Sequence, residues 1–296
     1  MYPPGVKCPL NTMQVISFIN MKGGVGKTTL AVNVSYALAE IHKKKVLLVD
    51  ADPQFNATTY LLEDEAYLKH VNDKKKGTLL DVFMPRRPGK INTVLGSAKG
   101  AGNKAKMPLS ACTCTIFDGG QGRGKLDLIP STLALIEIET SKRQTEAKLK
   151  VYLKEKAGQY DYVIIDCPPT ISVFTQAAVL ASDKYLVPIK PDPLSVIGLP
   201  LLERWLDDFT DDAGMEMERI GLVLTLVSGN LPTTMRQIID DLRAERKDEV
   251  FASVLNVSTD VASSVEAHLP VFHHKKNGKT ANQLLYITQE FIKRTT

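Results

Sequence analysis

The chain has 296 residues, of which 44% are hydrophobic and 24% are charged, and its formal net charge is +4 at pH 7. These are ordinary values for a globular protein with room for a sizeable core. The sequence has no run of about 18 apolar residues, which excludes a conventional membrane-spanning helix. A net charge this small permits weak attraction to polyanions but does not by itself indicate nucleic acid.

Short β-branched runs alternate with amphipathic segments, as in a parallel sheet covered by helices on both faces. The predicted strands are 15–20, 45–50, 125–130, 161–166, 184–189 and 220–226, with a weaker one at 250–255. Helical periodicity predicts helices over 27–41, 132–157, 171–181, 195–209, 232–246 and 280–293. We therefore expect a doubly wound α/β fold with a mostly parallel sheet of about seven or eight strands.

We expect an N-terminal arm over residues 1–13 and one domain over 14–296, interrupted by a basic, flexible insertion near 84–125. That insertion holds eight Lys or Arg residues against one acidic residue, Asp118, and it contains at most one short strand, around 112–117. Loops of this length are usually functional or disordered, so it is either a passive loop or a binding loop for an anionic partner.

The four cysteines favour a reducing cytoplasm. Cys112 and Cys114 are separated by a single residue, which is neither the spacing of a redox pair nor that of half a zinc site. Cys8 and Cys167 have no neighbouring cysteine in the sequence. We expect free thiols.

A glycine loop follows the first predicted strand and leads into a helix, an arrangement that binds phosphate through backbone N–H groups and the helix dipole. The predicted nucleotide-binding residues of this loop are Gly23, Gly24, Val25, Gly26, Lys27, Thr28 and Thr29. Lys27 is placed to reach the terminal phosphates, and Thr28 to ligate Mg²⁺. Met21 occupies the position where the usual pattern has its first glycine.

Three carboxylates follow predicted strands, at the edge where α/β sheets bind their ligands. Asp166 ends an apolar strand, as a carboxylate that holds Mg²⁺ does. Asp50 and Asp52 end another strand, and their spacing places both carboxylates on one side of the extended chain. Asp52 can orient an attacking water, or it can cap the following helix.

The stretches "KGGVGKTT", "LLVDADPQFNATTYLL", "LDLIPS" and "YVIIDCPP" resemble, in order and spacing, the ParA/MinD superfamily of deviant-Walker P-loop ATPases, and most closely its ParA (Soj) partition branch. In that family an early lysine, Lys22 here, crosses the interface of an ATP-sandwich homodimer to reach the partner's phosphates. The resemblance implies catalytic roles for Lys22, Lys27 and Asp52, a metal site of Thr28, Asp50 and Asp166, and the cofactors ATP and Mg²⁺. It also implies that Lys22 contacts nucleotide.

The resemblance further implies slow ATP hydrolysis stimulated by a ParB-like centromere-binding or adaptor protein. The ATP dimer binds DNA non-specifically and segregates or positions a plasmid, a chromosome or another cargo. Such a protein is cytoplasmic and nucleoid-associated, in a bacterium or an archaeon. The short N-terminal lead-in has no room for a helix-turn-helix domain, so we expect no operator-specific binding.

Two groups of contacts are implied less directly. The adenine loop corresponds to residues 253–272, where Leu255 replaces a common proline and Asp260 or Glu266 fills an acidic role. DNA binding needs several cations on one face, each neutralising a phosphate. The candidates are Arg236, Arg243, Arg246, Lys247, Lys275 and Lys276.

Two other functions remain as alternatives. A MinD-like membrane-cycling ATPase needs a basic amphipathic tail, whereas the C-terminal helix carries only Lys293 and Arg294 as cations near its end. We expect that helix to dock on the core and the membrane not to be a partner. An electron-carrying relative needs paired interface cysteines, and Cys167 has no partner in the sequence.

Overall fold

The computed structural model describes residues 13–84, 107–121, 123–139 and 145–296. Within these ranges, eight strands form one sheet in the order β3-β4-β2-β5-β1-β6-β7-β8. The strands are β1 (Gln14–Phe18), β2 (Lys45–Asp50), β3 (Cys114–Asp118), β4 (Lys125–Ile129), β5 (Tyr162–Asp166), β6 (Lys184–Ile189), β7 (Glu218–Val227) and β8 (Leu255–Asn256). Only β3 runs antiparallel to its neighbour, β4, which confirms the predicted fold class.

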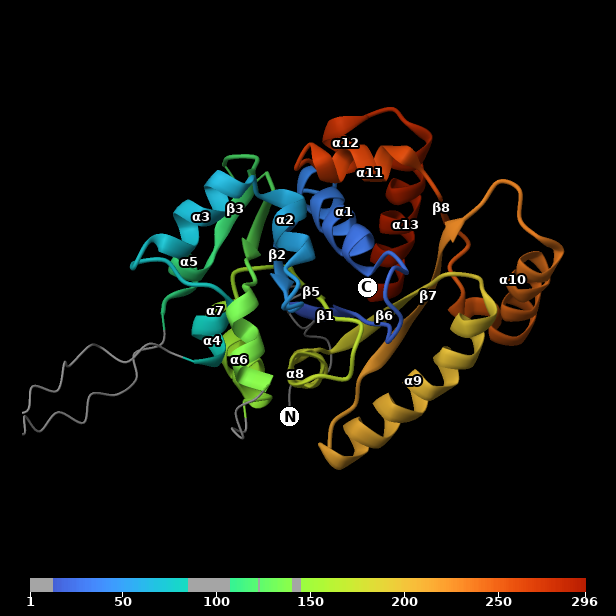
Figure 1. Ribbon diagram of the computed structural model, residues 1–296, viewed down its shortest axis with the longest axis horizontal. Helices are drawn as coiled ribbons and strands as arrows, with labels where there is room; N and C mark the ends of the chain where they lie inside the picture. The colour runs from blue at the N-terminus through green and yellow to red at the C-terminus, as the bar shows by residue number, and fades with distance from the viewer. Residues whose placement is uncertain (1–12, 85–106, 122, 140–144) are drawn as a thin grey trace, which may run out of the picture.

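Helices cover both faces of this sheet (Figure 1). The longer ones are α1 (Lys27–Glu40), α3 (Asp64–Asn72), α7 (Ala147–Lys156), α8 (Val173–Ala181), α9 (Pro193–Asp212), α10 (Thr233–Arg246), α11 (Thr259–Glu266) and α13 (Lys279–Thr295). The shorter ones are α2 (Asn56–Leu61), α4 (Leu79–Phe83), α5 (Leu109–Cys112), α6 (Ile136–Glu139) and α12 (Val271–His274), with 3₁₀ turns at Leu133–Leu135 and Lys247–Glu249.

The buried apolar side chains form two clusters, one on each face of the sheet. One cluster includes residues of α1, α2, α12 and α13 together with strand residues such as Ile16 and Ile164. The other includes residues of α4, α7, α8, α9 and α10 together with Val15 and Val163. Because neighbouring residues of a strand point to opposite faces, β1 and β5 contribute apolar side chains to both clusters.

Helix α13 docks on the core, as expected from the sequence. Leu284, Ile287 and Phe291 are fully buried, and the Phe291 ring packs 6.1 Å from that of Phe18 in the central strand. No helix in the described ranges is long and apolar enough to cross a membrane.

Two sequence expectations were wrong in detail. The single helix predicted over 132–157 is divided, because Thr132 caps a 3₁₀ turn and α7 begins only after Glu146. The weak strand at 250–255 reduces to a bridge between Val250 and Leu222, with β8 starting only at Leu255.

The predicted insertion is described only at its flanks. Residues 85–106 lie outside the described ranges, as do residues 1–12 of the predicted arm. The expected short strand is present as β3, and Lys125 forms an ion pair with Asp127 (2.7 Å). Cys112, Cys114 and Cys167 are free thiols, as predicted.

Candidate nucleotide-binding site

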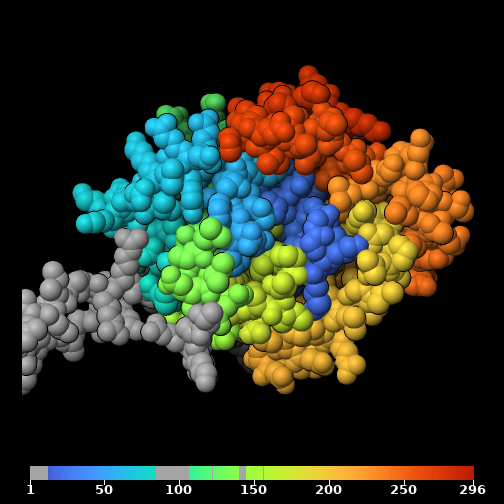
Figure 2. Space-filling model, viewed as in Figure 1, coloured from blue at the N-terminus to red at the C-terminus, as the bar shows by residue number. Residues whose placement is uncertain are grey.

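The predicted phosphate loop joins the central strand β1 to the start of α1. Gly24 and Gly26 have φ angles of +69° and +82°, a conformation that glycine adopts without a steric penalty. Gly26 directly precedes the first helical residue, Lys27, so the N–H groups of the first turn of α1 face the loop. Figure 2 shows this segment, in blue, reaching the surface between α2 in light blue and α9 in yellow.

Thr225 of β7 supports this loop from the neighbouring part of the sheet. Its buried hydroxyl donates to the carbonyl oxygen of Val25 (2.7 Å), and its Cγ2 atom lies 3.7 Å from where a Cβ on Gly26 would be. No local sequence pattern predicts this contact, because Thr225 is 200 positions from its partner.

Lys27 lies inside the loop and is 7% exposed. Its ammonium donates to the carbonyl oxygen of Lys22 (3.0 Å). Burial lowers the pKa of Lys27, and the nearby carboxylate of Asp166 opposes that shift. A buried cation at the centre of a phosphate loop is suited to a polyanionic ligand.

Asp166 ends β5 and is fully buried. Its Oδ2 atom accepts a hydrogen bond from the Thr28 hydroxyl (2.7 Å), whereas Oδ1 has no hydrogen-bond partner among the described residues. Burial, followed by the charge of Asp50, raises the pKa of Asp166 well above its usual value. One free carboxylate oxygen beside a hydroxyl is the hard-oxygen set that Mg²⁺ takes alongside nucleotide phosphates, so these residues fit that ion.

Asp50 and Asp166 are adjacent in register, because β2 and β5 are parallel neighbours that end together. Both carboxylate oxygens of Asp50 are engaged: Oδ2 accepts from the backbone N–H (2.8 Å) and the hydroxyl (2.7 Å) of Thr58, and Oδ1 from the N–H of Asp52 (3.2 Å). Asp50 therefore anchors the segment after β2. Burial raises its pKa to about 7.

Asp52 begins that segment and lines the cavity above the phosphate loop. The cavity has a volume of about 320 Å³. Its lining residues are Gly23, Gly24, Val25, Gly26, Lys27, Thr28, Thr29, Asp52, Asn56, Thr59, Tyr60, Pro169 and Val265. Asn56 and Thr59 were not predicted, although both lie in the quoted stretch that contains Asp52.

Lys22 is paired with the start of α9 and is not among the residues that line the cavity. Its ammonium lies 2.6 Å from both carboxylate oxygens of Asp192 and 3.4 Å from the hydroxyl of Ser195. Asp192 caps α9 by accepting from the N–H of Ser195 (2.9 Å). The two lysines of the loop therefore have different surroundings: Lys27 is buried in the loop, and Lys22 is partly exposed beside α9.

Asp260, predicted for adenine, lies at the start of α11 and is not part of the cavity lining described above. Its carboxylate accepts from the ammonium of Lys275 (2.7 Å) and the hydroxyl of Thr280 (3.1 Å). Val265, five residues later, is the residue of α11 that lines the cavity.

The basic residues predicted for DNA have unequal surroundings. Arg236, Arg243, Lys247, Lys275 and Lys276 are exposed. Arg246 is half-buried and forms ion pairs with Glu203 (2.9 Å) and Glu249 (3.7 Å).

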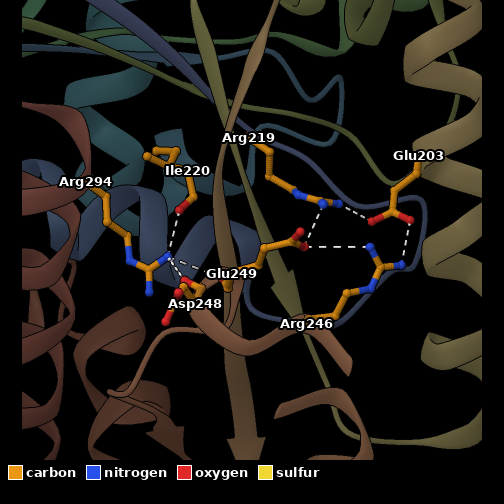
Figure 3. A network of polar contacts seen from close by, with 7 residues as sticks. All are labelled: Glu203, Arg219, Ile220, Arg246, Asp248, Glu249 and Arg294. Atoms are coloured by element: carbon orange, nitrogen blue, oxygen red, sulfur yellow. Dashed lines mark hydrogen bonds and ion pairs between the residues drawn. The ribbon is translucent and has the colours of Figure 1, made fainter. Parts of the chain in front are cut away.

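Figure 3 shows that Arg246 and Arg219 converge on the same two carboxylates. On the other side of Glu249, Arg294 donates to the carbonyl oxygens of Ile220 (3.1 Å) and Asp248 (2.6 Å). These contacts tie α9, α10 and α13 to β7.

Comparison with known proteins identifies the family. A family model described as an AAA domain matches residues 13–218. The chromosome partitioning protein ParA of Caulobacter vibrioides is 30% identical over 289 residues, 96% of this chain and 96% of that protein. The sporulation initiation inhibitor protein Soj of Bacillus subtilis is 27% identical, covering 94% of this chain and 97% of its own.

The fold has a close counterpart among solved structures. A plasmid partition protein from Borrelia burgdorferi, bound to AMPPNP, has a TM-score of 0.73 at 22% identity and covers 95% of this chain and 99% of that one. At this identity the likeness concerns the fold alone. The family match and the similarity in sequence over nearly the whole chain show that the protein belongs to the AAA-domain family and to the ParA branch of the ParA/MinD superfamily.

Proposed function

We propose that the protein is a Mg²⁺-dependent ATPase that acts as a dimerisation switch. ATP binds at the phosphate loop, and two ATP-bound chains form a homodimer around the two nucleotides. Lys22 of each chain reaches the phosphates held by the other, and hydrolysis to ADP and phosphate releases the dimer.

The observation that carries this proposal is the contrast between the two lysines. Lys27 is buried in the loop, where a bound phosphate would meet it. Lys22 is partly exposed, is paired with Asp192, and does not line the cavity of its own chain. A cation in this position is available to a second chain when ATP brings the two loops together.

The chemistry follows from the groups around the cavity. Thr28 and Asp166 would hold Mg²⁺, which supplies charge neutralisation at the phosphate oxygens. Lys27 and Lys22 stabilise the charge that spreads over the transferred phosphoryl group. Asp52 orients the attacking water, while Asp50 fixes the segment that carries Asp52.

We extend the proposal to DNA and cargo on the grounds of family membership. The exposed cations Arg236, Arg243 and Lys247 lie on α10 and the turn that follows it, and Lys276 lies after α12. Arg246 also lies on α10 and Lys275 precedes Lys276, but their ion pairs compete with a role in DNA binding. A ParB-like partner would stimulate hydrolysis, and the cargo is a plasmid, a chromosome or another assembly.

The proposal is tested by measuring molar mass by light scattering with ATP and Mg²⁺. We expect Asp52→Ala to accumulate as a dimer without hydrolysis, and Lys22→Ala to remain monomeric while still binding ADP. The control is Lys293→Ala, an exposed lysine of α13, which should dimerise as the unmodified chain does. If Lys22→Ala still dimerises with ATP, Lys22 is not required in the site of the partner chain.

DNA binding is tested separately with the Asp52→Ala dimer and a non-specific duplex. Binding that requires ATP and weakens with salt supports the switch. Binding to anionic vesicles without binding to DNA would contradict it and favour the membrane-cycling alternative.

A further inference from the structure

Phe55 has an unusual backbone conformation next to the catalytic candidate Asp52. Its φ and ψ angles are 46° and 40°, in the left-handed region. Glycine adopts this conformation freely, whereas a bulky residue rarely does. We therefore expect a contact of the Phe55 side chain to offset the cost of this backbone conformation.

That interaction is a stacked pair with Tyr67 of α3. The two rings are 5.6 Å apart between centroids and nearly parallel, at 8°. Helices α2 and α3 follow one another along the chain (Figure 1). The ring pair joins the residue before α2 to the middle of α3. Stacking at this distance adds to the apolar contact of the two rings.

The pair is connected to the main chain of Asp52 through Ser131, just after β4. The Tyr67 hydroxyl donates to the carbonyl oxygen of Ser131 (3.2 Å), and the Ser131 hydroxyl donates to the carbonyl oxygen of Asp52 (2.7 Å). Ser131 is fully buried, so its orientation is fixed. A chain of contacts, called here the circuit, thus links Phe55 through Tyr67 and Ser131 to the main chain of Asp52.

The same circuit sets the direction of the Asp52 carboxylate. The N–H of Phe55 donates to the carbonyl oxygen of Asp52 (2.8 Å), and the N–H of Gln54 donates to Asp52 Oδ1 (2.9 Å). A change at Phe55 therefore moves the turn that holds Asp52. Within the described residues, Asp52 and Asn56 line the cavity, and neither Phe55 nor Tyr67 does.

We propose that Phe55 and Tyr67 are positioning residues for Asp52, which set the rate of ATP hydrolysis without contacting the nucleotide. The proposal rests on the proposed function, in which Asp52 orients the attacking water. We expect loss of the stacked pair to lower kcat more than it lowers the affinity for nucleotide, because a small displacement of a catalytic group slows the chemical step more than it weakens binding.

The test uses the full chain and compares variants that separate the stack from its hydroxyl. In Tyr67→Leu and Phe55→Leu the stack is lost, and we expect kcat to fall about tenfold while KM for ATP and Kd for ADP change less than twofold. Tyr67→Phe keeps the ring and loses only the bond to Ser131, so we expect a fall in kcat that is smaller than in Tyr67→Leu. Leu68→Ala, an exposed neighbour on α3, is the control.

A second readout does not depend on turnover. Hydrogen exchange by mass spectrometry, without nucleotide, should show faster exchange over residues 52–58 in the two Leu variants and unchanged exchange in β5. The Phe55→Gly variant should lie between the Leu variant and the unmodified chain, since glycine accepts the left-handed conformation without the stack.

The outcomes distinguish this inference from the proposed function. If Asp52→Ala abolishes hydrolysis but both Leu variants keep the unmodified kcat, or if exchange over 52–58 does not change, the positioning role is overturned and the proposed function stands. If Asp52→Ala keeps full turnover, the proposed role of Asp52 fails and the positioning role fails with it. A lower kcat with faster exchange over 52–58 in both Leu variants, and a smaller loss of kcat in Tyr67→Phe, supports the inference.

Discussion

Lys22 and Asp192 form a two-oxygen ion pair, with the Lys22 ammonium 2.6 Å from each carboxylate oxygen of Asp192. The pair joins the phosphate loop to the start of α9, and the two side chains are 30% and 12% exposed. In the proposed dimer, Lys22 must first leave this carboxylate to serve the second chain, so we expect the pair to oppose dimerisation.

Replacing Asp192 with Asn should therefore favour the ATP dimer. Asn keeps the helix cap that Asp192 provides but removes the charge. A partly exposed ion pair contributes about 1 kcal/mol or less, so we expect the ATP concentration at half-dimerisation to fall by up to about fivefold. The measurement is a titration of molar mass against ATP in the Asp52→Ala background.

The matched control for that titration is Asp183→Asn, which changes another acidic side chain that accepts a backbone N–H, that of Val15. A midpoint that shifts equally in both variants, or that rises in Asp192→Asn, would show that Asp192 does not restrain Lys22.

Thr225→Val should weaken nucleotide binding. The substitution keeps the shape of the side chain and removes the hydroxyl that donates to Val25, leaving a buried carbonyl oxygen without this partner. Such a loss costs about 1–3 kcal/mol, part of it in the conformation of the phosphate loop. We expect Kd for ADP, measured by calorimetry, to rise at least about fivefold.

Thr225→Ser retains the hydroxyl and should restore the affinity of the unmodified chain. Equal Kd values for the Val and Ser variants would exclude a role for this hydrogen bond in holding the loop.

Asp50 should make stability depend on pH. Burial raises the pKa of Asp50 from an ordinary value of 3.8 to about 7, so between these values the folded chain holds a proton that the unfolded chain releases. The free energy of unfolding therefore falls as pH rises through this window, by up to about 1.4 kcal/mol per pH unit, and no further above it. The slope is measured by urea unfolding of the protein without nucleotide or Mg²⁺, at about four pH values between pH 5 and pH 8.

Asp50→Asn removes this titration and should give a shallower slope, while Asp240→Asn, on the exposed face of α10, should follow the unmodified chain. A slope in Asp50→Asn as steep as the original would assign the pH dependence to other groups.

Arginines on α10 should divide into two classes. Arg236→Ala and Arg243→Ala each remove an exposed cation, so each should weaken binding to non-specific DNA. Each should also reduce the slope of the logarithm of the binding constant against the logarithm of salt concentration by about one. Arg246→Ala breaks ion pairs with Glu203 and Glu249 and should instead lower the free energy of unfolding by about 1 kcal/mol. Fluorescence anisotropy at several salt concentrations, together with urea unfolding, separates the two effects.

If Arg246→Ala reduced DNA affinity as much as Arg236→Ala and left stability unchanged, the ion-pair network would be dispensable and Arg246 would belong to the DNA surface.

The sequence by itself determined the fold class and the phosphate loop. Apolar strands such as 45–50 and 161–166 are recognisable because burial on both faces leaves no polar alternation. The loop is recognisable because its glycines, Lys27 and Thr28 act within one short segment. The carboxylates Asp50 and Asp166 are recognisable because each ends an apolar strand, and these two strands lie side by side.

Only the tertiary structure decided which distant groups support that segment. Lys22 is paired with a residue 170 positions away, and the main chain of Asp52 is held by Ser131, 79 positions away. Arg246 shares one face of its helix with Arg243 in the sequence pattern, yet it turns toward Glu203 of α9. Periodicity gives the side of a helix on which a residue lies, but the partner depends on packing between elements that the local pattern does not specify.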